Sequence, residues 1–379
     1  MKTFRQILFA FLAGAIVVAR GAEKNFYPEL APYFHPPSEF TGFGKYPDVL
    51  SIETAKGFDS GKKPIRSKRD WQRRRKEIKV TWEDFLGPWP PLLKNNHLRV
   101  IETTNRETFI QKRVEVTVAN NLTNVGWLLE PKGKGPFPAV VVPYYEPETS
   151  IGMSKQKLRD FGLQLARRGF VTLSIGSPGG DARAPDVAGA KCQPLSFLAY
   201  IASNCRIALA NLPEVDPKRI GIVGHSYGGK WAMFATCLDE KFACGVFSDP
   251  GIVFDEARPN VNYWEPWYLG KDPDFTRKPG VITPENPRTG AYRELIASGH
   301  DLHELLALIA PRPFLVSGGS EDQLQRWQPL NRVREVYDLL GAPNRVGMTN
   351  RPNHDPTEES NAQIYQFFEC ALKPEKVRP

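Results

Sequence analysis

The sequence predicts an α/β fold in which a mostly parallel sheet is covered by helices on both faces. The runs at 137–143, 170–175 and 219–224 are almost continuously apolar, as expected of strands that are buried on both faces. Helical patterns separate the strands, and such alternation is typical of a parallel sheet. Further strands are expected at 243–248, 313–319 and 345–349, and helices at 154–168, 194–212, 228–238, 327–340 and 357–371.

The segment before these strands is expected to add antiparallel strands to the sheet. Residues 113–119 alternate between polar and apolar side chains, and a second strand is expected at 125–129, after a turn. Antiparallel strands that lead into a parallel sheet fit an α/β-hydrolase arrangement. Upstream, a helix is expected at 67–86, because apolar side chains recur at helical spacing and GPWPP follows.

The chain is expected to contain a leader, an N-terminal arm and one α/β-hydrolase domain. Of its 379 residues, 41% are apolar, which is enough for a large core. We expect a signal peptide at 1–21, an arm and a helix packed on the core at 22–98, and the hydrolase domain at 99–379. An irregular insertion rich in Tyr and Trp is expected at about 249–290.

The first residues resemble a secretory signal peptide. Lys2 and Arg5 precede an uncharged apolar stretch at 7–18, and the small residues Ala19 and Gly21 offer cleavage sites. The stretch is shorter than the ~20 residues that span a bilayer, although an uncleaved anchor is the alternative. We therefore expect a secreted or periplasmic protein without membrane contact after cleavage.

The net charge bears on the expected binding partners, and the cysteines bear on possible disulfide bonds. The formal net charge is +8, much of it within 62–79; it would attract an acidic polymer, although a solvated helix face explains it as well. Export argues against a nucleic-acid partner.

The five cysteines allow disulfides in an exported protein. Cys192–Cys205 and Cys237–Cys244 are candidate pairs, but spacing alone cannot assign them.

The segment GHSYGG at 224–229 is the main candidate for chemistry. It joins an expected strand to an expected helix and fits G-x-S-x-G, in which a serine nucleophile is exposed on a sharp turn. The flanking glycines let strand and helix approach closely, and the helix N-terminus favours the negative charge that develops in the transition state. We therefore expect Ser226 to be a nucleophile rather than part of a plain glycine-rich turn.

A serine nucleophile needs a base and a carboxylate. His354 lies just beyond the last strand, where this fold presents its base, after the serine and the acid in chain order. The acid usually follows the penultimate strand, where VSGGSEDQ supplies Asp322, the preferred candidate, and Glu321. Asp249, which follows the strand after the elbow helix, is the other alternative.

Other side chains are expected to complete the site. The oxyanion hole should use the backbone N–H of Tyr227 and a second N–H from Tyr145 or Tyr144, after the strand at 137–143. Trp264 and Trp267 offer flat faces for pyranose rings, although packing within the insertion is the simpler role for either.

No metal or cofactor is expected. His300 and His303 are three residues apart, but no carboxylate or cysteine spacing completes a metal site around them, and the chain has no CxxC pair. Roles on a helix surface or at a helix cap explain the two histidines better.

Two motifs resemble those of known carbohydrate esterases. GHSYGGKWA is similar to the G-x-S-x-x-G-K-x-A elbow of glucuronoyl esterases, and DLHELLALIAPRPFLVSGG at 301–319 resembles the strand that leads to their acid loop. The chain is also similar to acetyl xylan esterases and dienelactone-hydrolase-like enzymes. The resemblance implies Ser226 as nucleophile, His354 as base and Lys230 as a contact to the uronate sugar; a solvent-facing helix residue is the alternative for Lys230.

Two departures bear on the substrate. Tyr227 stands where glucuronoyl esterases typically have Arg, and Asp249-Pro250-Gly251 stands where they typically have Glu-Ser-Gly. An acetyl or other short-acyl ester therefore fits at least as well as a uronate ester.

We expect a secreted serine carboxylesterase that removes acyl, acetyl-type, or uronate esters from plant or algal polysaccharide through an acyl-enzyme. Its expected partner is the polysaccharide or oligosaccharide ester. One alternative is a peptidase or dienelactone-type hydrolase on the same triad. Another is a catalytically silent carbohydrate-binding α/β-hydrolase homologue.

Overall fold

A computed structural model of the chain describes residues 28–53 and 61–373. The signal peptide expected at 1–21 lies outside these residues. Among the helices that are described, none has both the length and the apolar character needed to cross a membrane.

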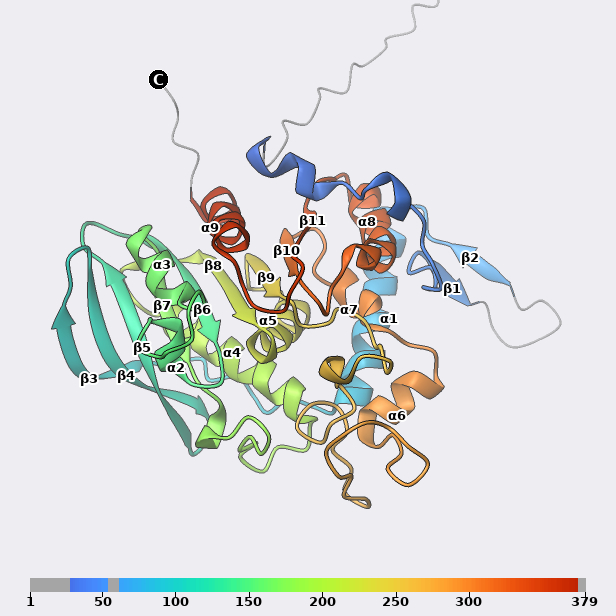
Figure 1. The fold of residues 1–379 in the computed structure, drawn as a ribbon, viewed down its shortest axis with the longest axis horizontal. Coiled ribbons are helices and arrows are strands. Elements are labelled where there is room, and N and C mark those ends of the chain that lie inside the picture. Colours follow the sequence, from blue (N-terminus) through green and yellow to red (C-terminus); the bar gives the residue numbers. More distant parts are fainter. Residues whose placement is uncertain (1–27, 54–60, 374–379) are drawn as a thin grey trace, which may run out of the picture.

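A nine-stranded sheet forms the centre of the molecule (Figure 1). Its strands are β3 (Leu98–Asn105), β4 (Phe109–Ala119), β5 (Leu122–Pro131), β6 (Phe137–Pro143), β7 (Val171–Ile175), β8 (Val215–His225), β9 (Cys244–Ser248), β10 (Phe314–Gly318) and β11 (Val346–Asn350). Their spatial order is β11-β10-β9-β8-β6-β7-β5-β4-β3. The strands from β11 to β7 are parallel, whereas β5, β4 and β3 are antiparallel additions. The predicted α/β-hydrolase fold is confirmed.

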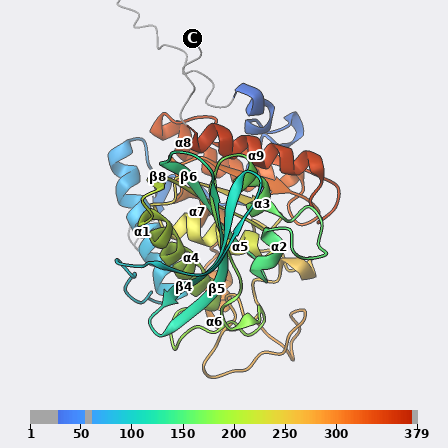
Figure 2. The same cartoon turned by 90° about the vertical axis from the view of Figure 1, so that its left-hand side faces the viewer.

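Helices cover both faces of the sheet, as Figure 2 shows. The first face carries α1 (Lys68–Leu86), α4 (Pro194–Ala210), α5 (Tyr227–Leu238), α7 (Leu302–Ala307) and α8 (Trp327–Leu340). The second face carries α3 (Phe161–Arg167) and α9 (Glu358–Leu372).

The two cores explain why the central strands lack polar positions. In β6, Val141 packs into the core of the first face, whereas Val140 and Val142 pack into that of the second. Because successive side chains of a strand point to opposite faces, a strand covered on both sides must be apolar throughout.

Helix α1 has the boundaries expected from the sequence. Ser67 caps it by accepting a hydrogen bond from the Asp70 N–H at 3.1 Å, and Gly87, with φ of 82°, follows its last residue. Its apolar stripe includes Trp71 and Trp82, both fully buried against the core. The exposed face holds the basic residues, several of them paired with carboxylates of the same helix.

Some elements differ from the expectation. α3 begins at Phe161 rather than near 154, because Leu158 adopts φ of 61°, which is incompatible with a helix. β3 was not expected, since most of its residues are exposed and it shows no alternation of apolar and polar side chains. α6 (Gly290–Ala297) and α7 were also not expected.

The insertion has an ion pair and a tryptophan in its interior. Arg277 and Glu265 form a buried salt bridge at 3.0 Å, and Glu265 also accepts the Gly280 N–H at 2.9 Å. Trp264 is 1% exposed and donates through Nε1 to the Gly280 carbonyl at 2.9 Å. These contacts order a segment with little regular structure.

The candidate disulfides are absent. Cys192, Cys205, Cys237 and Cys244 all lie in the described part of the chain as free thiols. The suggested pairs Cys192–Cys205 and Cys237–Cys244 are therefore wrong. Cys205 and Cys237 lie in helices and Cys244 in a strand, where each packs as a small apolar side chain.

Candidate active site

Ser226 lies on the sharp turn between β8 and α5. Its φ of 55° and ψ of −113° are unusual for a residue with a side chain and mark a strained backbone. A Cβ on Gly224 would lie 2.1 Å from the Gly228 carbonyl oxygen, and one on Gly228 would lie 2.2 Å from that of Pro143. Only glycine fits at these two positions, so the glycines of the motif allow the close approach of strand and helix.

Backbone hydrogen bonds hold the turn to its neighbours. The Ser226 N–H donates to the Ser248 carbonyl at 2.8 Å, and the Lys230 N–H donates to the Ser226 carbonyl at 2.9 Å. The N–H of Tyr144 is taken by the Ile175 carbonyl at 3.0 Å, which leaves Tyr145 as the better of the two expected oxyanion donors. The oxyanion hole itself stays a prediction.

His354 is hydrogen-bonded to Asp249, and this corrects the preferred assignment of the acid. His354 Nδ1 lies 2.7 Å from Asp249 Oδ2. The Asp249 side chain is fully buried, whereas that of His354 is 34% exposed. The other carboxylate oxygen, Oδ1, accepts the N–H groups of Gly319 at 2.6 Å and Asp322 at 2.9 Å. A carboxylate held in this way fixes the orientation of the imidazole.

Asp322, the preferred candidate, points elsewhere. Its carboxylate accepts the N–H groups of Gly251 at 2.8 Å and Ile252 at 2.7 Å. Burial raises the pKa of Asp322 to about 6, and the neighbouring Asp249 contributes to this rise. Asp322 is therefore not the hydrogen-bond partner of His354, although it follows the expected strand.

Glu321, the third candidate, lies close to the pair without bonding to the imidazole. Its buried carboxylate faces Arg258 at 3.4 Å and accepts the Ser320 hydroxyl at 3.0 Å. Ligand atoms of Asp249, Glu321 and His354 lie within 4.8 Å of one another, a grouping of side chains that can hold a cation. Asp249 and His354 are hydrogen-bonded to each other, so two of these three groups are already paired.

No direct hydrogen bond joins the Ser226 and His354 side chains within the described part of the chain. His225, directly before the serine, packs its ring against that of His354, with centroids 4.7 Å apart. Burial holds the pKa of His225 well below its usual range, and His354 contributes to the shift. His225 is therefore neutral. Loose contacts between nucleophile and base are common before substrate binds.

Sequence reasoning missed His225 and Arg351 as parts of the site. The buried guanidinium of Arg351 donates to the carbonyls of His354 at 2.6 Å, Asp355 at 2.8 Å and Ser317 at 2.8 Å. It thereby ties the loop that carries His354 to the end of β10. An arginine three residues before the expected base was the available signal.

Tyrosines form one wall of the site. The rings of Tyr145 and Tyr227 are stacked with centroids 4.8 Å apart, and the Tyr227 hydroxyl lies 2.5 Å from the Ser177 hydroxyl. Burial raises the pKa of Tyr145, while a hydrogen bond to the Ser226 side chain opposes the rise. The Tyr145 phenol therefore lies beside the Ser226 hydroxyl, whereas the Tyr227 phenol is buried and paired with Ser177.

The residues expected to contact sugar are mostly buried. Trp264 is part of the interior of the insertion, which corrects its expected role as a sugar-binding surface. Trp267 is 9% exposed, with the Arg183 guanidinium 5.9 Å from its ring. Lys230 is 3% exposed, which excludes the solvent-facing alternative, and its ammonium donates to the Pro250 carbonyl. Burial lowers the pKa of Lys230 to about 8. A direct sugar contact by Lys230 stays a prediction.

The two histidines near the acid loop have structural contacts. His300 Nδ1 lies 2.6 Å from Glu304, and the buried His303 contacts the Pro47 carbonyl through Nε2 at 3.1 Å. They do not share a ligand-binding arrangement within the described residues.

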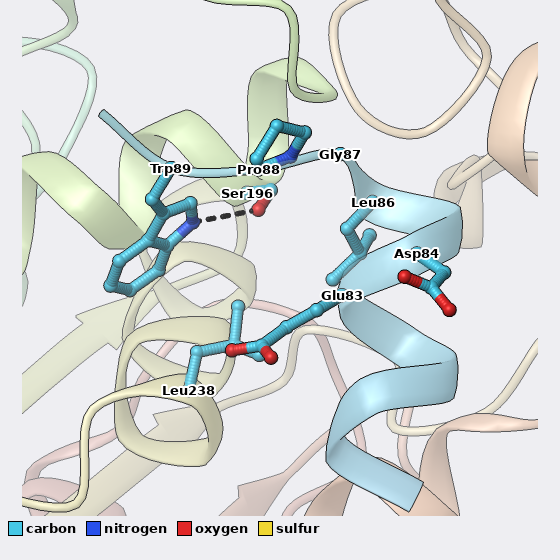
Figure 3. A pocket seen from close by; sticks show the side chains of 8 residues that line it. All are labelled: Glu83, Asp84, Leu86, Gly87, Pro88, Trp89, Ser196 and Leu238. Atoms are coloured by element: carbon cyan, nitrogen blue, oxygen red, sulfur yellow. Dashed lines mark hydrogen bonds between the residues drawn. The ribbon is translucent and has the colours of Figure 1, made fainter. Parts of the chain in front are cut away.

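A cavity of about 560 Å³ lies between the end of α1 and helices α4 and α5 (Figure 3). Trp89 borders it and donates to the Ser196 hydroxyl at 2.9 Å. None of the expected site residues lines this cavity. Its lining consists of Glu83, Asp84, Leu86, Gly87, Pro88, Trp89, Ser196 and Leu238.

The known proteins similar to this chain include carbohydrate esterases. A 4-O-methyl-glucuronoyl methylesterase of Wolfiporia cocos is 25% identical over 210 residues, which are 49% of this chain and 48% of the relative. Acetyl esterase Axe7A of Xylanibacter ruminicola is 23% identical over 256 residues, 62% of this chain and 53% of the relative. The chain thus spans about half the length of these relatives. No protein-family model matches it.

The fold is similar to that of solved glucuronoyl esterases. The structure of a Solibacter usitatus glucuronoyl esterase aligns with a TM-score of 0.66 at 16% identity, over 87% of this chain and 98% of that one. A CE15 esterase from a marine bacterial metagenome aligns with a TM-score of 0.62 at 17% identity, over 86% and 97% of the two chains. The resemblance inferred from the elbow and the acid-loop strand is confirmed.

Proposed function

We propose that the protein is a serine carboxylesterase that acts on a carbohydrate ester, with Ser226 as nucleophile, His354 as base and Asp249 as acid. The observation that carries the proposal is the 2.7 Å hydrogen bond between His354 and Asp249 beside the strained elbow of Ser226. A plain glycine-rich turn would need neither the buried carboxylate nor the oriented imidazole.

In the proposed reaction, the Ser226 hydroxyl oxygen attacks the ester carbonyl carbon while His354 takes the proton of that hydroxyl. Asp249 stabilises the imidazolium that forms. The Tyr227 and Tyr145 N–H groups are proposed to bind the oxyanion, at the N-terminus of α5. The imidazolium then protonates the leaving alcohol, and a water molecule activated by His354 releases the acid from the acyl-enzyme.

The proposed substrates are acetyl-type or uronate esters of a plant or algal polysaccharide. The relatives named as glucuronoyl and acetyl esterases support both classes. Tyr227 supplies no cation at the position next to the nucleophile, and the Tyr145 ring narrows the space beside Ser226. Both features favour a small, uncharged acyl group over a uronate.

The test is hydrolysis of p-nitrophenyl acetate, acetylated xylan and a methyl glucuronate ester by the wild type and by Ser226→Ala. We expect acetate release from the first two substrates and a loss of roughly 10⁴-fold or more in kcat in the variant. Activity that survives in Ser226→Ala would refute the nucleophile. Small peptides in the same panel test a peptidase, and sugar binding without turnover would indicate a silent homologue.

Export to the periplasm or the medium is proposed from the leader-like sequence at 1–21. Sequencing the N-terminus of the protein recovered from the native host tests it. A mature protein that begins near residue 20 to 22 supports export, and an intact Met1 in a cytoplasmic fraction contradicts it.

A further inference from the structure

The turn that carries Asp249 is held by contacts beyond those that a connecting loop needs. Asp249 has φ of 50°, a conformation that costs of order 1–3 kcal/mol and persists only where the surroundings enforce it. Three buried side chains from distant parts of the chain, Lys230, Tyr263 and Asp322, contact the residues that directly follow Asp249.

Asp249 and Asp322 hold each other's loops reciprocally. The Asp249 carboxylate accepts the N–H of Asp322 at 2.9 Å, and the Asp322 carboxylate accepts the N–H groups of Gly251 at 2.8 Å and Ile252 at 2.7 Å. The loops after β9 and β10 are thus joined by both side chains at once. Movement of either loop breaks charge-assisted hydrogen bonds in a site without water access to replace them.

Lys230 and Tyr263 hold the other side of the same turn. The Lys230 ammonium donates to the Pro250 carbonyl and lies 4.7 Å from the centre of the Tyr263 ring. The Tyr263 hydroxyl donates to the Gly251 carbonyl at 2.7 Å. Every peptide group from Pro250 to Ile252 thereby has a side-chain partner on its N–H or carbonyl. The carboxylates of Asp322, Glu321 and Asp249 also interact electrostatically with Lys230 and oppose the lowering of its pKa by burial.

We propose that Asp322 and Lys230 are positioning residues, which keep the 249–252 turn strained so that the Asp249 carboxylate remains on His354. The inference rests on the proposed function, because it assigns them an effect on the triad acid. Neither side chain hydrogen-bonds to His354 or Ser226 within the described part of the chain. The proposed effect on catalysis therefore passes through Asp249, and the variants below test this route.

Asp322→Asn tests the first part. An amide can accept only one of the two N–H groups, because its own NH₂ faces the other, and it loses the charge. We expect kcat on p-nitrophenyl acetate to fall about 10- to 100-fold with KM within twofold. The acidic limb of the kcat/KM profile should move to lower pH, because a displaced carboxylate stabilises the imidazolium less.

Asp301→Asn is the matched control. The Asp301 carboxylate also accepts two backbone N–H groups, from Phe254 at 2.9 Å and Leu302 at 2.6 Å, but among the described residues it forms no hydrogen bond to the 249–252 turn. We expect its kcat to stay within about twofold of wild type. An equal loss of kcat in Asp301→Asn and Asp322→Asn would overturn the inference.

A double variant distinguishes a positioning role of Asp322 from a general effect of its substitution on stability. If Asp322 acts through Asp249, Asp249→Asn/Asp322→Asn should have the kcat of Asp249→Asn alone within about twofold. A further 10-fold loss in the double variant would contradict the inference. Lys230→Met keeps the apolar stem but removes the hydrogen bond to the Pro250 carbonyl. Introduced into the wild-type protein, it should lower kcat about 5- to 10-fold. Introduced into Asp249→Asn, it should leave kcat unchanged.

Two outcomes keep this proposal distinct from the proposed function. Full activity in Ser226→Ala refutes the triad itself, whereas an inactive Ser226→Ala with an unaffected Asp322→Asn refutes only the positioning role. If Asp322→Asn does not fold, as judged by its circular dichroism and thermal transition, Tyr263→Phe replaces it. That variant removes one hydroxyl at constant ring volume and should lower kcat about threefold or more, and an unchanged kcat there would overturn the inference.

Discussion

The nucleophile elbow and the acid–base region of the proposed site are held in place by different means. At the elbow, Gly224 and Gly228 lie two residues from Ser226 on either side, and a Cβ at either position would clash with a backbone carbonyl, that of Gly228 or that of Pro143. Around His354 and Asp249, three loops after β9, β10 and β11 are joined by hydrogen bonds between residues 70 or more positions apart. The difference is that the elbow depends on two glycines close to Ser226 in sequence, whose backbone must pass close to carbonyl groups, whereas the acid–base region depends on buried polar contacts between distant segments.

The strongest test of the second region is Asp249→Asn. Loss of the charge opposite His354 should lower kcat roughly 10³- to 10⁴-fold, whereas Glu321→Gln should lower it less than about tenfold, because Glu321 bonds to Arg258 and Ser320 rather than to the imidazole. Steady-state kinetics on p-nitrophenyl acetate measures both. A larger loss in Glu321→Gln would reverse their roles.

The elbow is tested by Gly224→Ala. The added Cβ would lie 2.1 Å from the Gly228 carbonyl oxygen, so strand and helix must separate, and the free energy of unfolding should fall by about 3 kcal/mol. Gly42→Ala is the control, since no atom lies within 4 Å of the position of its Cβ. Urea denaturation gives both values, and equal stability of the two variants would show that the elbow tolerates movement.

Arg351→Lys probes the connection between the loops of the second region. Lysine cannot reproduce the contacts of the guanidinium to His354, Asp355 and Ser317, and we expect a kcat lower by about tenfold. KM should change little, because the substituted side chain is buried beneath the histidine loop. Wild-type kcat would mean that the loop keeps its place without these contacts.

The smallest expected effect is on the pH dependence of stability. Burial raises the pKa of Asp301 to about 6 from a model-compound value of 3.8. The folded state therefore holds this proton more tightly, so the carboxyl stabilises the fold below about pH 3.8, and this stabilisation is lost as the pH rises through 6. In Asp301→Asn, the free energy of unfolding should change less between pH 4 and 6 than in wild type. Urea titrations at both pH values check it, and parallel curves would contradict the shift.

The same contrast explains what could be predicted from the sequence. The strand–turn–helix at Ser226 is local, so its motif and the surrounding periodicity identified it together with the fold. The acid was harder, because Asp249 and Asp322 each follow a buried strand and differ only in the direction of the side chain. That direction depends on Gly251 and Ile252, whose N–H groups Asp322 accepts, and no sequence pattern reports it.

The burial of side chains such as Trp264 and Lys230 could not be predicted from the sequence either. Trp264 and an exposed sugar-binding tryptophan look the same in sequence, and only the nearby Arg277–Glu265 pair and the Gly280 carbonyl make its burial favourable. Lys230 was read as a ligand contact or a solvent-facing residue, but a carbonyl and two tyrosine rings hold its charge in the interior. Exposed strand β3 lacked the alternation that reveals a half-buried strand.

The free thiols of the core have a practical consequence for producing the protein. Burial raises the pKa of Cys192 to about 11 and that of Cys205 to about 12, so both thiols are protonated and unreactive at neutral pH. Because Cys192, Cys205, Cys237 and Cys244 are free thiols, the core needs no oxidant to form. A reducing bacterial cytoplasm should therefore yield the same folded protein as an oxidising compartment, and dithiothreitol in the buffer should leave its melting temperature unchanged.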